Sequence, residues 1–361
     1  MMRMLVAGDW HSDLHEEVVA RSLRRLGHEV GCFKWHTYFS SGDASCGTLQ
    51  RLLRQAQDKY VRGPLIARIN RDFVRAVIAF RPDTVFVYRG THIEAAALRA
   101  VRGALPGCRI VGYNNDDPFS LWQPRYLWRH FMQAIPEYDL MLAYRHANVA
   151  ALRAVGARRV ELMRSWYVPD RNFPIALSAA ERDEFESDVV FVGHYEPDQR
   201  LDHLEEIARQ GLRLRIFGPP KYWAAPLKNS PWLNHLAPTR MVWGDDYNRA
   251  LCGAKIALCF FSKLNRDTYT RRCFEIPATR TLMLSEYSDD LASLYREGEE
   301  ADFFRNRDEM IHKVKMYLAD DAARLDIAAA GYRRVVESGH DVDSRMAQML
   351  QWIGELEEGT A

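Results

Sequence analysis

The stretch Lys263–Phe304, KLNRDTYTRRCFEIPATRTLMLSEYSDDLASLYREGEEADFF, contains the clearest pattern in this chain of 361 residues. A polar, Arg-rich loop runs into a short helical segment that carries Arg272 and Glu275, and an apolar strand follows at 281–285. Backbone N–H groups at a helix start and Arg side chains bind phosphate oxygens, and a carboxylate further along accepts from ribose hydroxyls. The pattern therefore predicts a nucleotide-diphosphate site, with Arg272 on the phosphates and Glu275 on the ribose.

Strand and helix patterns alternate on both sides of the boundary between the two halves of the chain. Short apolar runs are typical of the strands of a buried parallel sheet, and the segments between them have helical spacing. The expected strands are 4–7, 28–33, 83–88, 109–113 and 140–143, and then 188–192, 213–217, 241–243, 256–260 and 282–284. Two such series predict an α/β fold of two Rossmann-like, doubly wound domains with a cleft between them.

The boundary falls within Ser165–Ser187, which contains two prolines and the charged run ERDEFESD. The first domain is predicted to cover 1–165 and the second 186–341. Residues 342–361 follow, with a helix expected at 342–357. A loop rich in Ser and Gly is expected at Ser40–Gly47.

The segment 267–278 has the pattern Asp-x-x-x-x-Arg-x-x-Glu-x-Pro-Ala, and 298–304 reads Gly-Glu-Glu-Ala-x-Phe-Phe. This combination resembles the C-terminal domain of CgeB-type (spore-maturation-like) glycosyltransferases, which are relatives of a large retaining GT-B family. The resemblance covers residues 186–350 and, in outline, the N-terminal half.

The resemblance implies a GT-B architecture in which the second domain holds a nucleotide-sugar donor and residues 342–361 cross back to the first domain. In the wider family two Glu residues eight positions apart flank the donor sugar and the ribose. Here Glu275 matches the second. The first position holds Asp267 and so departs from the family pattern. By its place in that pattern, Asp267 is a catalytic candidate beside the donor sugar.

Other candidates for donor binding follow the strands of the second domain. Gly193 and Gly218 each come directly after an expected strand, where a glycine lets the backbone approach a ligand. A βα turn is the structural alternative for both. The resemblance also implies a basic pair on the diphosphate, for which Arg200 and Lys263 are the candidates.

Three more observations concern the loop of the donor site. Thr268 and Arg271 belong to the loop and are candidate donor-binding residues together with Arg272. Arg272 and Glu275 are spaced for a plain i, i+3 salt bridge, which is the structural alternative to their functional interpretation. Pro277 predicts a short or bent helix.

Candidates on the acceptor side come from the first domain. His11 and Asp13 lie in the loop after the first strand, and either is a candidate general base if the reaction inverts configuration. Asp13 is also expected to cap the first helix, paired with Glu16. Asp116 and Asp117 follow another strand and precede a proline, so an acceptor contact and an Asx turn are both open for them. No metal ligand is assigned.

Composition indicates a globular protein, with 47% hydrophobic and 27% charged residues. No run reaches the length of a membrane span, and the first residues fit a strand better than a signal peptide. The cysteines show no C-x-x-C spacing, which favours reduced thiols and a cytoplasmic location. They are Cys32, Cys46, Cys108, Cys252, Cys259 and Cys273.

Charge is distributed unevenly. Residues 1–165 hold 24 Lys and Arg against 15 Asp and Glu, a net charge of +9, and 166–361 hold 25 against 33, a net charge of −8. Chance and solvated helix faces would explain this asymmetry. The alternative is a basic first domain that meets anionic lipid, at the inner face of a membrane, or an anionic acceptor. The basic residues are spread over several elements, so nucleic acid is not an expected partner.

Together with the predicted nucleotide-diphosphate site, the resemblance implies a metal-independent glycosyltransferase, hexosyltransferase-like and retaining, for polysaccharide biosynthesis. It would use no cofactor, since the nucleotide-diphosphate sugar is its donor substrate, and a glycan, lipid-linked or protein acceptor would receive the sugar. Two alternatives stay open, which are a nucleotide-sugar epimerase or hydrolase on the same fold and a non-catalytic nucleotide-sugar-binding protein. The P-loop, G-x-G-x-x-G, G-x-S-x-G and H-E-x-x-H motifs are missing, which disfavours kinases, classical dehydrogenases, α/β-hydrolases and zincins.

Overall fold

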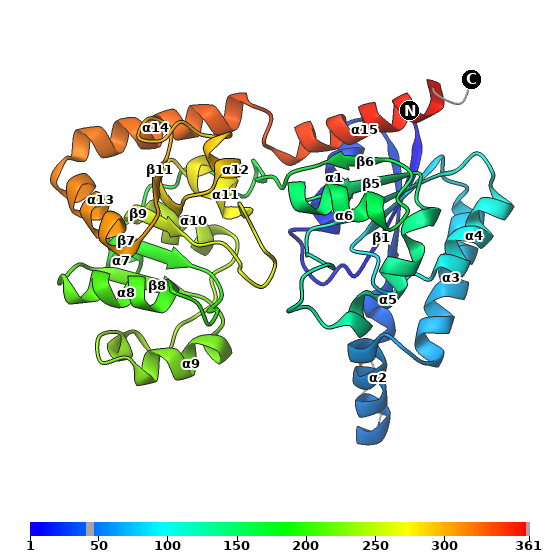
Figure 1. Ribbon diagram of the computed structural model, residues 1–361, viewed down its shortest axis with the longest axis horizontal. Helices are drawn as coiled ribbons and strands as arrows, with labels where there is room; N and C mark the ends of the chain where they lie inside the picture. Colours follow the sequence, from blue (N-terminus) through cyan, green and yellow to red (C-terminus); the bar gives the residue numbers. More distant parts are fainter. Residues whose placement is uncertain (41–46, 359–361) are drawn as a thin grey trace. The chain divides into compact units, whose positions relative to one another are not determined.

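The computed structural model describes residues 1–40 and 47–358. The chain divides into two compact units, one made of Met1–Arg164 with the segment from Val342 onward, and the other of Ser165–Asp341 (Figure 1). Residues 166–185, where the sequence predicted the boundary, belong to the second unit. Most of the loop predicted at Ser40–Gly47, with Cys46, lies outside the described residues, as do residues 359–361.

The first domain contains a parallel sheet in the order β2-β1-β3-β4-β5-β6. Its strands are β1 (Arg3–Gly8), β2 (Glu29–Lys34), β3 (Thr84–Tyr88), β4 (Arg109–Asn114), β5 (Leu140–Ala143) and β6 (Val160–Leu162). Its helices are α1 (Glu16–Arg25), α2 (Thr48–Tyr60), α3 (Pro64–Phe80), α4 (Ala95–Ala104), α5 (Arg125–Ala134), α6 (His146–Ala154) and α15 (Val342–Glu358), with short 3-10 turns η1 (Trp35–Tyr38) and η2 (Ile135–Glu137).

The second domain contains a parallel sheet in the order β11-β10-β9-β7-β8. Its strands are β7 (Ser187–Val192), β8 (Leu214–Phe217), β9 (Ala254–Cys259), β10 (Leu282–Glu286) and β11 (Asp302–Phe304). Its helices are α7 (Ala179–Phe185), α8 (Arg200–Arg209), α9 (Pro220–Asn229), α10 (Asp245–Cys252), α11 (Arg272–Ala278), α12 (Asp289–Ala292), α13 (Arg307–Ala319) and α14 (Asp321–Glu337), with a 3-10 turn η3 (Asn234–Leu236).

Each sheet is buried on both faces, which explains the apolar runs of the sequence. All five residues of β3 are buried, and four of the six in β7 are buried valine or phenylalanine. Helices supply the other half of each core, as Phe73 of α3 and Phe131 of α5 do in the first domain and Trp223 of α9 does in the second. Two doubly wound, Rossmann-like domains were predicted, and the structure confirms them.

The C-terminal helix α15 packs on the first domain although it follows the second in sequence. Arg25 and Asp343 form an ion pair of 2.7 Å, and Arg159 and Glu355 form another of 2.5 Å. Both connect α15 to elements of the first domain.

Three local predictions differ from the structure. Helix α1 begins at Glu16 with His15 at its N-cap and no side-chain capping bond, so the predicted Asp13–Glu16 capping pair is wrong. Residues 241–243 form no strand, although the carbonyl of the preceding Arg240 accepts from the backbone N–H of Gly218, just past β8, at 3.0 Å. Strand β11 was not predicted, since three residues inside GEEADFF are too short a signal.

Candidate functional site

Strand order points to one position in each domain. Reading outward from β1, the chain goes first to β2 on one side and then to β3 on the other, and β7 is flanked in the same way by β8 and β9. Ligands of doubly wound sheets bind outside the carboxyl ends of the strands at this reversal of strand order. The loops that follow β7 and β9 in the second domain, and β1 and β3 in the first, are therefore the places to examine.

Unusual backbone conformations lie in these same loops. Trp10 after β1, Arg89 after β3 and Arg266 after β9 have φ angles of 58°, 65° and 49°. A left-handed conformation costs a non-glycine residue about 1–2 kcal/mol, and such residues cluster at functional sites. The other three described non-glycine residues with a positive φ, Val61, Arg81 and Arg280, lie outside these loops, so strain is present at these edges but does not by itself single them out.

Gly193 and Gly218 let the loops after β7 and β8 touch. A Cβ at Gly218 would lie 2.1 Å from the carbonyl oxygen of Gly193, and the indole Nε1 of Trp223 donates to that oxygen at 2.9 Å. A Cβ at Gly193 would lie 3.1 Å from Nη1 of Arg272. The glycine at 193 therefore leaves room for the guanidinium beside the end of β7.

Arg272 is the cation at the centre of this edge. Its Nε is buried and has no hydrogen-bond partner within the described residues. Burial opposes its charge, but nearby Cys259, Tyr247 and Glu275 raise the pKa of the guanidinium. Together with burial, its charge lowers the pKa of His194 in the loop after β7, which keeps that imidazole neutral. Arg272 is thus a fixed positive charge with unused hydrogen-bonding capacity.

Glu275 lies one turn further along α11 and is buried. Its Oε2 accepts a hydrogen bond from the hydroxyl of Tyr247 at 2.7 Å, so its described partner is a tyrosine of α10 and not Arg272. Burial, followed by the charge of Glu275, raises the pKa of Tyr247 well above its usual value, so the phenol stays a donor at neutral pH. The tyrosine fixes one carboxylate oxygen and leaves Oε1 for another partner.

The loop between β9 and α11 is held by its neighbours. Glu286, at the end of β10, accepts from the backbone N–H of Phe261 at 2.6 Å and from Nζ of Lys263 at 3.1 Å. The hydroxyl of Thr268 donates to Asp290 at 2.5 Å. Lys263 and Thr268, two of the predicted donor-binding residues, are therefore already bonded to carboxylates of β10 and α12.

Two other predicted residues lie in this loop. The backbone N–H of Asp267 donates to the carbonyl of Ser262 at 2.9 Å, which closes the turn at Arg266. Arg271 stands at the N-cap of α11, with its guanidinium 5.8 Å from the ring centre of Trp166. Both belong to the loop that leads into Arg272.

Arg200 has a structural role in this conformation. It is buried, and it binds both carboxylate oxygens of Asp198 at 2.7 Å. It also donates to the carbonyl of His194 at 2.6 Å and of Phe261 at 3.2 Å. Its guanidinium thus ties the loop after β7 to the loop after β9, and these hydrogen bonds use four of its five N–H groups.

In the first domain, Glu16 controls the loop after β1. Its Oε1 accepts from the backbone N–H of Asp9 at 2.9 Å, and a Cβ at Gly8 would lie 2.2 Å from that oxygen. Burial raises the pKa of Glu16 to about 7. His11 and Asp13, the predicted candidates in this loop, are exposed.

The loops after β3 and β4 meet through carboxylates. Asp116 forms a 2.9 Å ion pair with Nε of Arg89. Asp117 is buried, and its Oδ1 accepts from the backbone N–H of Phe119 at 3.0 Å and from Asn148 at 2.8 Å. The first contact of Asp117 is the Asx turn considered for this position.

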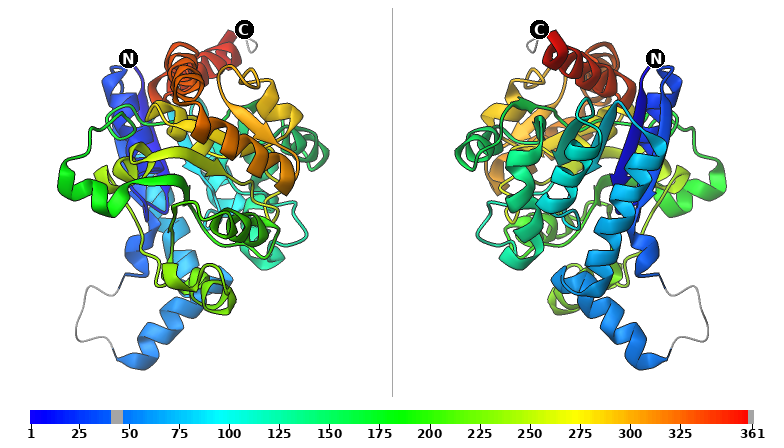
Figure 2. Two further views of the ribbon diagram at one scale, coloured as in Figure 1. Left: turned by 90° about the vertical axis from the view of Figure 1, so that its left-hand side faces the viewer. Right: turned by 90° about the vertical axis from the view of Figure 1, so that its right-hand side faces the viewer.

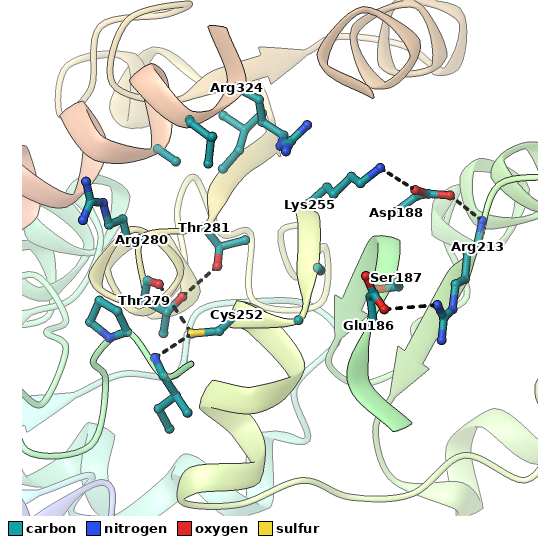
Figure 3. Close-up of a pocket in the computed structure, with 17 residues that line it drawn as sticks. Glu186, Ser187, Asp188, Arg213, Cys252, Lys255, Thr279, Arg280, Thr281 and Arg324 are labelled. Carbon is teal, nitrogen blue, oxygen red and sulfur yellow. Dashed lines mark hydrogen bonds and ion pairs between the residues drawn. The ribbon is translucent and has the colours of Figure 1, made fainter. Parts of the chain in front are cut away.

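A basic pocket at the opposite edge of the second sheet differs from this site. It has a volume of about 430 Å³ and lies at the amino ends of β7, β9 and β10 (Figure 3). Lys255 lies 3.3 Å from Asp188 and Arg213 lies 3.7 Å from Glu186, while Arg324 pairs with Asp321. Three of the four cations that line the pocket thus have carboxylate partners, and the fourth, Arg280, is exposed to solvent, so the pocket is a poorer anion site than the carboxyl edge.

Sequence reasoning missed several residues that the fold brings to the site. Tyr247 was not among the predicted site residues, because nothing in the sequence connects it with Glu275, 28 positions away. Glu16 was expected at a capping box, and Arg89 was not considered. The YRG at the end of β3 was the available signal for Arg89, since Gly next to a polar residue after a strand indicates a tight turn. Among residues 1–40 and 47–358, no three His, Cys, Asp or Glu side chains gather to hold a metal ion.

Comparison with protein families and solved structures extends these observations. Residues 199–351 match a family model described as glycosyl transferase-like. The matched segment begins just before α8 and contains Arg272, Glu275 and Tyr247. No curated protein sequence matches the chain.

Solved structures share the fold at low sequence identity. Sucrose-phosphate synthase from Thermosynechococcus elongatus aligns over 99% of this chain and 100% of its own, with 11% identity and a TM-score of 0.72. HepE from Anabaena, in complex with UDP-glucose, aligns over 98% and 100%, with 13% identity and a TM-score of 0.65. A glycosyltransferase from Rickettsia africae aligns over 98% of both chains, with 13% identity and a TM-score of 0.65. The two Rossmann-like domains are therefore those of the GT-B fold.

Proposed function

We propose that this protein is a glycosyltransferase that moves a sugar from a nucleotide-diphosphate sugar to an acceptor hydroxyl. The observation that carries the proposal is Arg272, whose buried Nε lacks a partner in the described chain and whose guanidinium lies against Gly193. A fixed cation placed where a diphosphate leaving group gains charge stabilises the transition state of such a transfer. The family match over 199–351 supports the same class of reaction.

In this proposal each residue of the edge has one task. Arg272 neutralises the diphosphate, with Arg271 and Lys263 as further cations near the loop. Glu275 accepts from a ribose hydroxyl through Oε1, while Tyr247 holds Oε2. Gly193 and Gly218 admit the nucleotide close to the backbone, and Thr268 and Asp267 lie on the side of the donor sugar.

UDP is the nucleotide to test first. HepE, which shares the fold, has been solved with UDP-glucose and with UDP. We further propose that the transfer retains the anomeric configuration and needs no metal ion. The acceptor is a glycan, a lipid-linked saccharide or a protein, presented by the first domain near Asp116 and Asp117. The membrane is a peripheral partner of that domain.

Nucleotide binding tests the donor site directly. We expect UDP to raise the melting temperature, by the equivalent of about 2.7 kcal/mol at a hundredfold excess over Kd. EDTA should leave the shift intact, Glu275→Ala should reduce it strongly, and Glu337→Ala, at an exposed glutamate of α14, should not. GDP, ADP, CDP and dTDP serve as comparisons. No shift with any of the five nucleotides would contradict the donor site.

Product analysis then separates the alternatives. With a UDP-sugar and an acceptor mixture, transfer with release of UDP is the expected result. Free sugar or an epimer formed without acceptor would indicate a hydrolase or an epimerase, and binding without turnover would indicate a binding protein. Proton NMR of the first product would report whether the anomeric configuration is retained.

A further inference from the structure

Helix α2 of the first domain has an apolar stripe that its own domain leaves uncovered. None of the residues in Thr48–Tyr60 is buried. The side chains of Leu49, Leu52, Leu53 and Tyr60 are exposed by 71%, 55%, 53% and 50%. At about 100° per residue these four positions, together with Ala56, fall within a stripe about 100° wide. The stripe has the width with which a helix normally faces a core.

The last turn of α2 fixes the helix to the domain. Gln57 accepts from the backbone N–H of Leu65 at 2.8 Å, and Asp58 lies 3.2 Å from Nε2 of His92. The ring of Tyr60 lies 5.3 Å from that of Tyr126. The preceding turns extend away from the sheet of the first domain, as the views of Figures 1 and 2 both show. The leucines are thus presented on a helix that is held at one end.

Positive charge accompanies the stripe. The segment 47–62 contains four basic residues, Arg51, Arg54, Lys59 and Arg62, against one acidic residue, Asp58. That single carboxylate faces His92. On the helical wheel Lys59 borders the stripe, whereas Arg51 and Arg54 lie on the opposite, polar face, about 150° from the middle of the stripe. A helix with an apolar face, cations on its polar face and little negative charge is the kind that lies in the interface of a bilayer with anionic lipids.

We infer that α2 is the element through which this protein contacts a membrane surface that carries anionic lipid. Leu49, Leu52 and Leu53 enter the headgroup region, where Lys59 at the border of the stripe binds anionic headgroups. The long side chains of Arg51 and Arg54 extend from the polar face toward the same layer of headgroups. The peripheral membrane contact was proposed above without a particular surface, and the inference assigns it to helix α2. It rests on that part of the proposed function, but it does not require the donor site to bind UDP.

A second copy of the chain fits the stripe less well. A helix of 13 residues is about 20 Å long, and a stripe of that length covers much less than the roughly 800 Å² per partner of a stable dimer. Two copies would also bring like charges together, since each helix carries mostly basic side chains. An anionic lipid surface supplies the opposite charge.

Vesicle cosedimentation of the full chain tests this inference. One set of vesicles is pure phosphatidylcholine, and the other is equal parts phosphatidylcholine and phosphatidylglycerol. We expect the protein to sediment with the anionic vesicles, to be released by high salt, and to stay in solution with the neutral ones. The combined change Leu49→Gln, Leu52→Gln and Leu53→Gln should weaken sedimentation at least about tenfold.

Charge variants and matched controls complete the design. Arg51→Gln with Arg54→Gln should weaken anionic binding about tenfold or more, because each basic residue near such a surface adds to the binding. Arg71→Gln with Arg75→Gln removes the same charge from α3, where both side chains lie within 4 Å of Asp72, and should have a smaller effect. Leu325→Gln, at an exposed leucine of α14, controls for the loss of an apolar side chain.

Three results would overturn the inference. The wild-type protein might fail to sediment with anionic vesicles, or the leucine variant might sediment as the wild type does. Light scattering might instead reveal a dimer that the leucine variant dissociates, which would make the stripe an interface between copies. The UDP-induced melting shift, measured on the same variants, should stay unchanged, so that loss of lipid binding and failure of the donor site are told apart.

Discussion

The carboxyl edges of the two sheets have the same topology but use their charged residues differently. In the second domain, Arg272 keeps a buried Nε without a partner in the described chain. In the first domain, the carboxylates of Glu16, Asp116 and Asp117 are engaged with a backbone N–H, with Arg89 and with Asn148. Nε of Arg89 at the first edge also lacks a hydrogen bond within the described chain, but it lies 2.9 Å from Asp116, whereas no described carboxylate forms an ion pair with Arg272. The pairing of charges therefore makes the second edge the better match for a diphosphate.

Removing the charge of Arg272 should have the largest effect. We expect Arg272→Ala to lower the rate of sugar transfer by about 10²–10³-fold, the range seen when one donor to a developing charge is removed. The UDP-induced melting shift should also disappear. Arg272→Lys should recover only part of both, because an ammonium lacks the planar pair of donors.

Arg213→Ala is the matched control for this variant. It removes an arginine from the pocket at the amino edge, where Glu186 is its partner. Transfer and UDP binding should stay within about twofold of the wild type. A large loss of transfer activity and UDP binding in Arg213→Ala, with little loss in Arg272→Ala, would mean that the diphosphate binds in the pocket of Figure 3 and not beside Arg272.

The buried carboxyl group of Glu16, at the carboxyl edge of the first sheet, should make the free energy of unfolding depend on pH. Folding raises the pKa of Glu16 from 4.5 to about 7, mainly through burial, so the folded state favours the protonated carboxyl. Its contribution is complete below pH 4.5 and is lost as the pH rises through 7. Glu16→Gln keeps an acceptor for Asp9 without the charge. It should therefore gain stability over the wild type with rising pH, on the order of 2–3 kcal/mol at pH 8.

Urea unfolding of both proteins between about pH 5 and pH 8 measures this difference. Glu17→Gln, at the next position of α1, is the control and should show no such trend. Parallel pH profiles for the wild type and Glu16→Gln would mean that Glu16 has an ordinary pKa in the folded protein.

Space beside Arg272 is the next feature of the second edge to test. A Cβ at position 193 would lie 2.9 Å from Cζ of Phe191 and 3.1 Å from Nη1 of Arg272. Gly193→Ala should displace the guanidinium by a few tenths of an ångström and weaken UDP binding about tenfold, with a stability loss of about 1 kcal/mol. Titration calorimetry would measure the affinity. Gly103→Ala, in open space on α4, is the control, and equal affinities in the two variants would separate Gly193 from the donor site.

The sequence was sufficient for the parts of this edge that are contiguous in the chain. The loop before Arg272, the spacing to Glu275 and the glycines after two strands are local patterns, and the structure has them at strand ends and on α11. The apolar strands were equally clear, because a parallel sheet buried on both faces requires unbroken apolar runs.

What could not be predicted depends on contacts between distant segments. The position Glu16 has the spacing of a capping box, but the close approach at Gly8 and the N–H of Asp9 direct its carboxylate to the loop after β1. Residues 241–243 have the composition of a strand, but the structure has no strand there, and the described contact of this segment with the end of β8 is the bond from Gly218 N–H to the carbonyl of Arg240. The partner of Glu275 is likewise a tyrosine that only folding brings near.

That tyrosine gives the smallest expected effect at the second edge. Tyr247→Phe removes the hydroxyl that donates to Oε2 of Glu275 at 2.7 Å and leaves the ring in place. If Tyr247 positions the carboxylate for the ribose, KM for the donor should rise about threefold to tenfold while kcat changes little, since ribose binding is common to the ground and transition states. A donor that lacks the ribose hydroxyls should bind the wild type and Tyr247→Phe equally. An equal loss with that donor would mean that the hydroxyl of Tyr247 supports the packing of α10 on α11 and has no part in recognising the ribose.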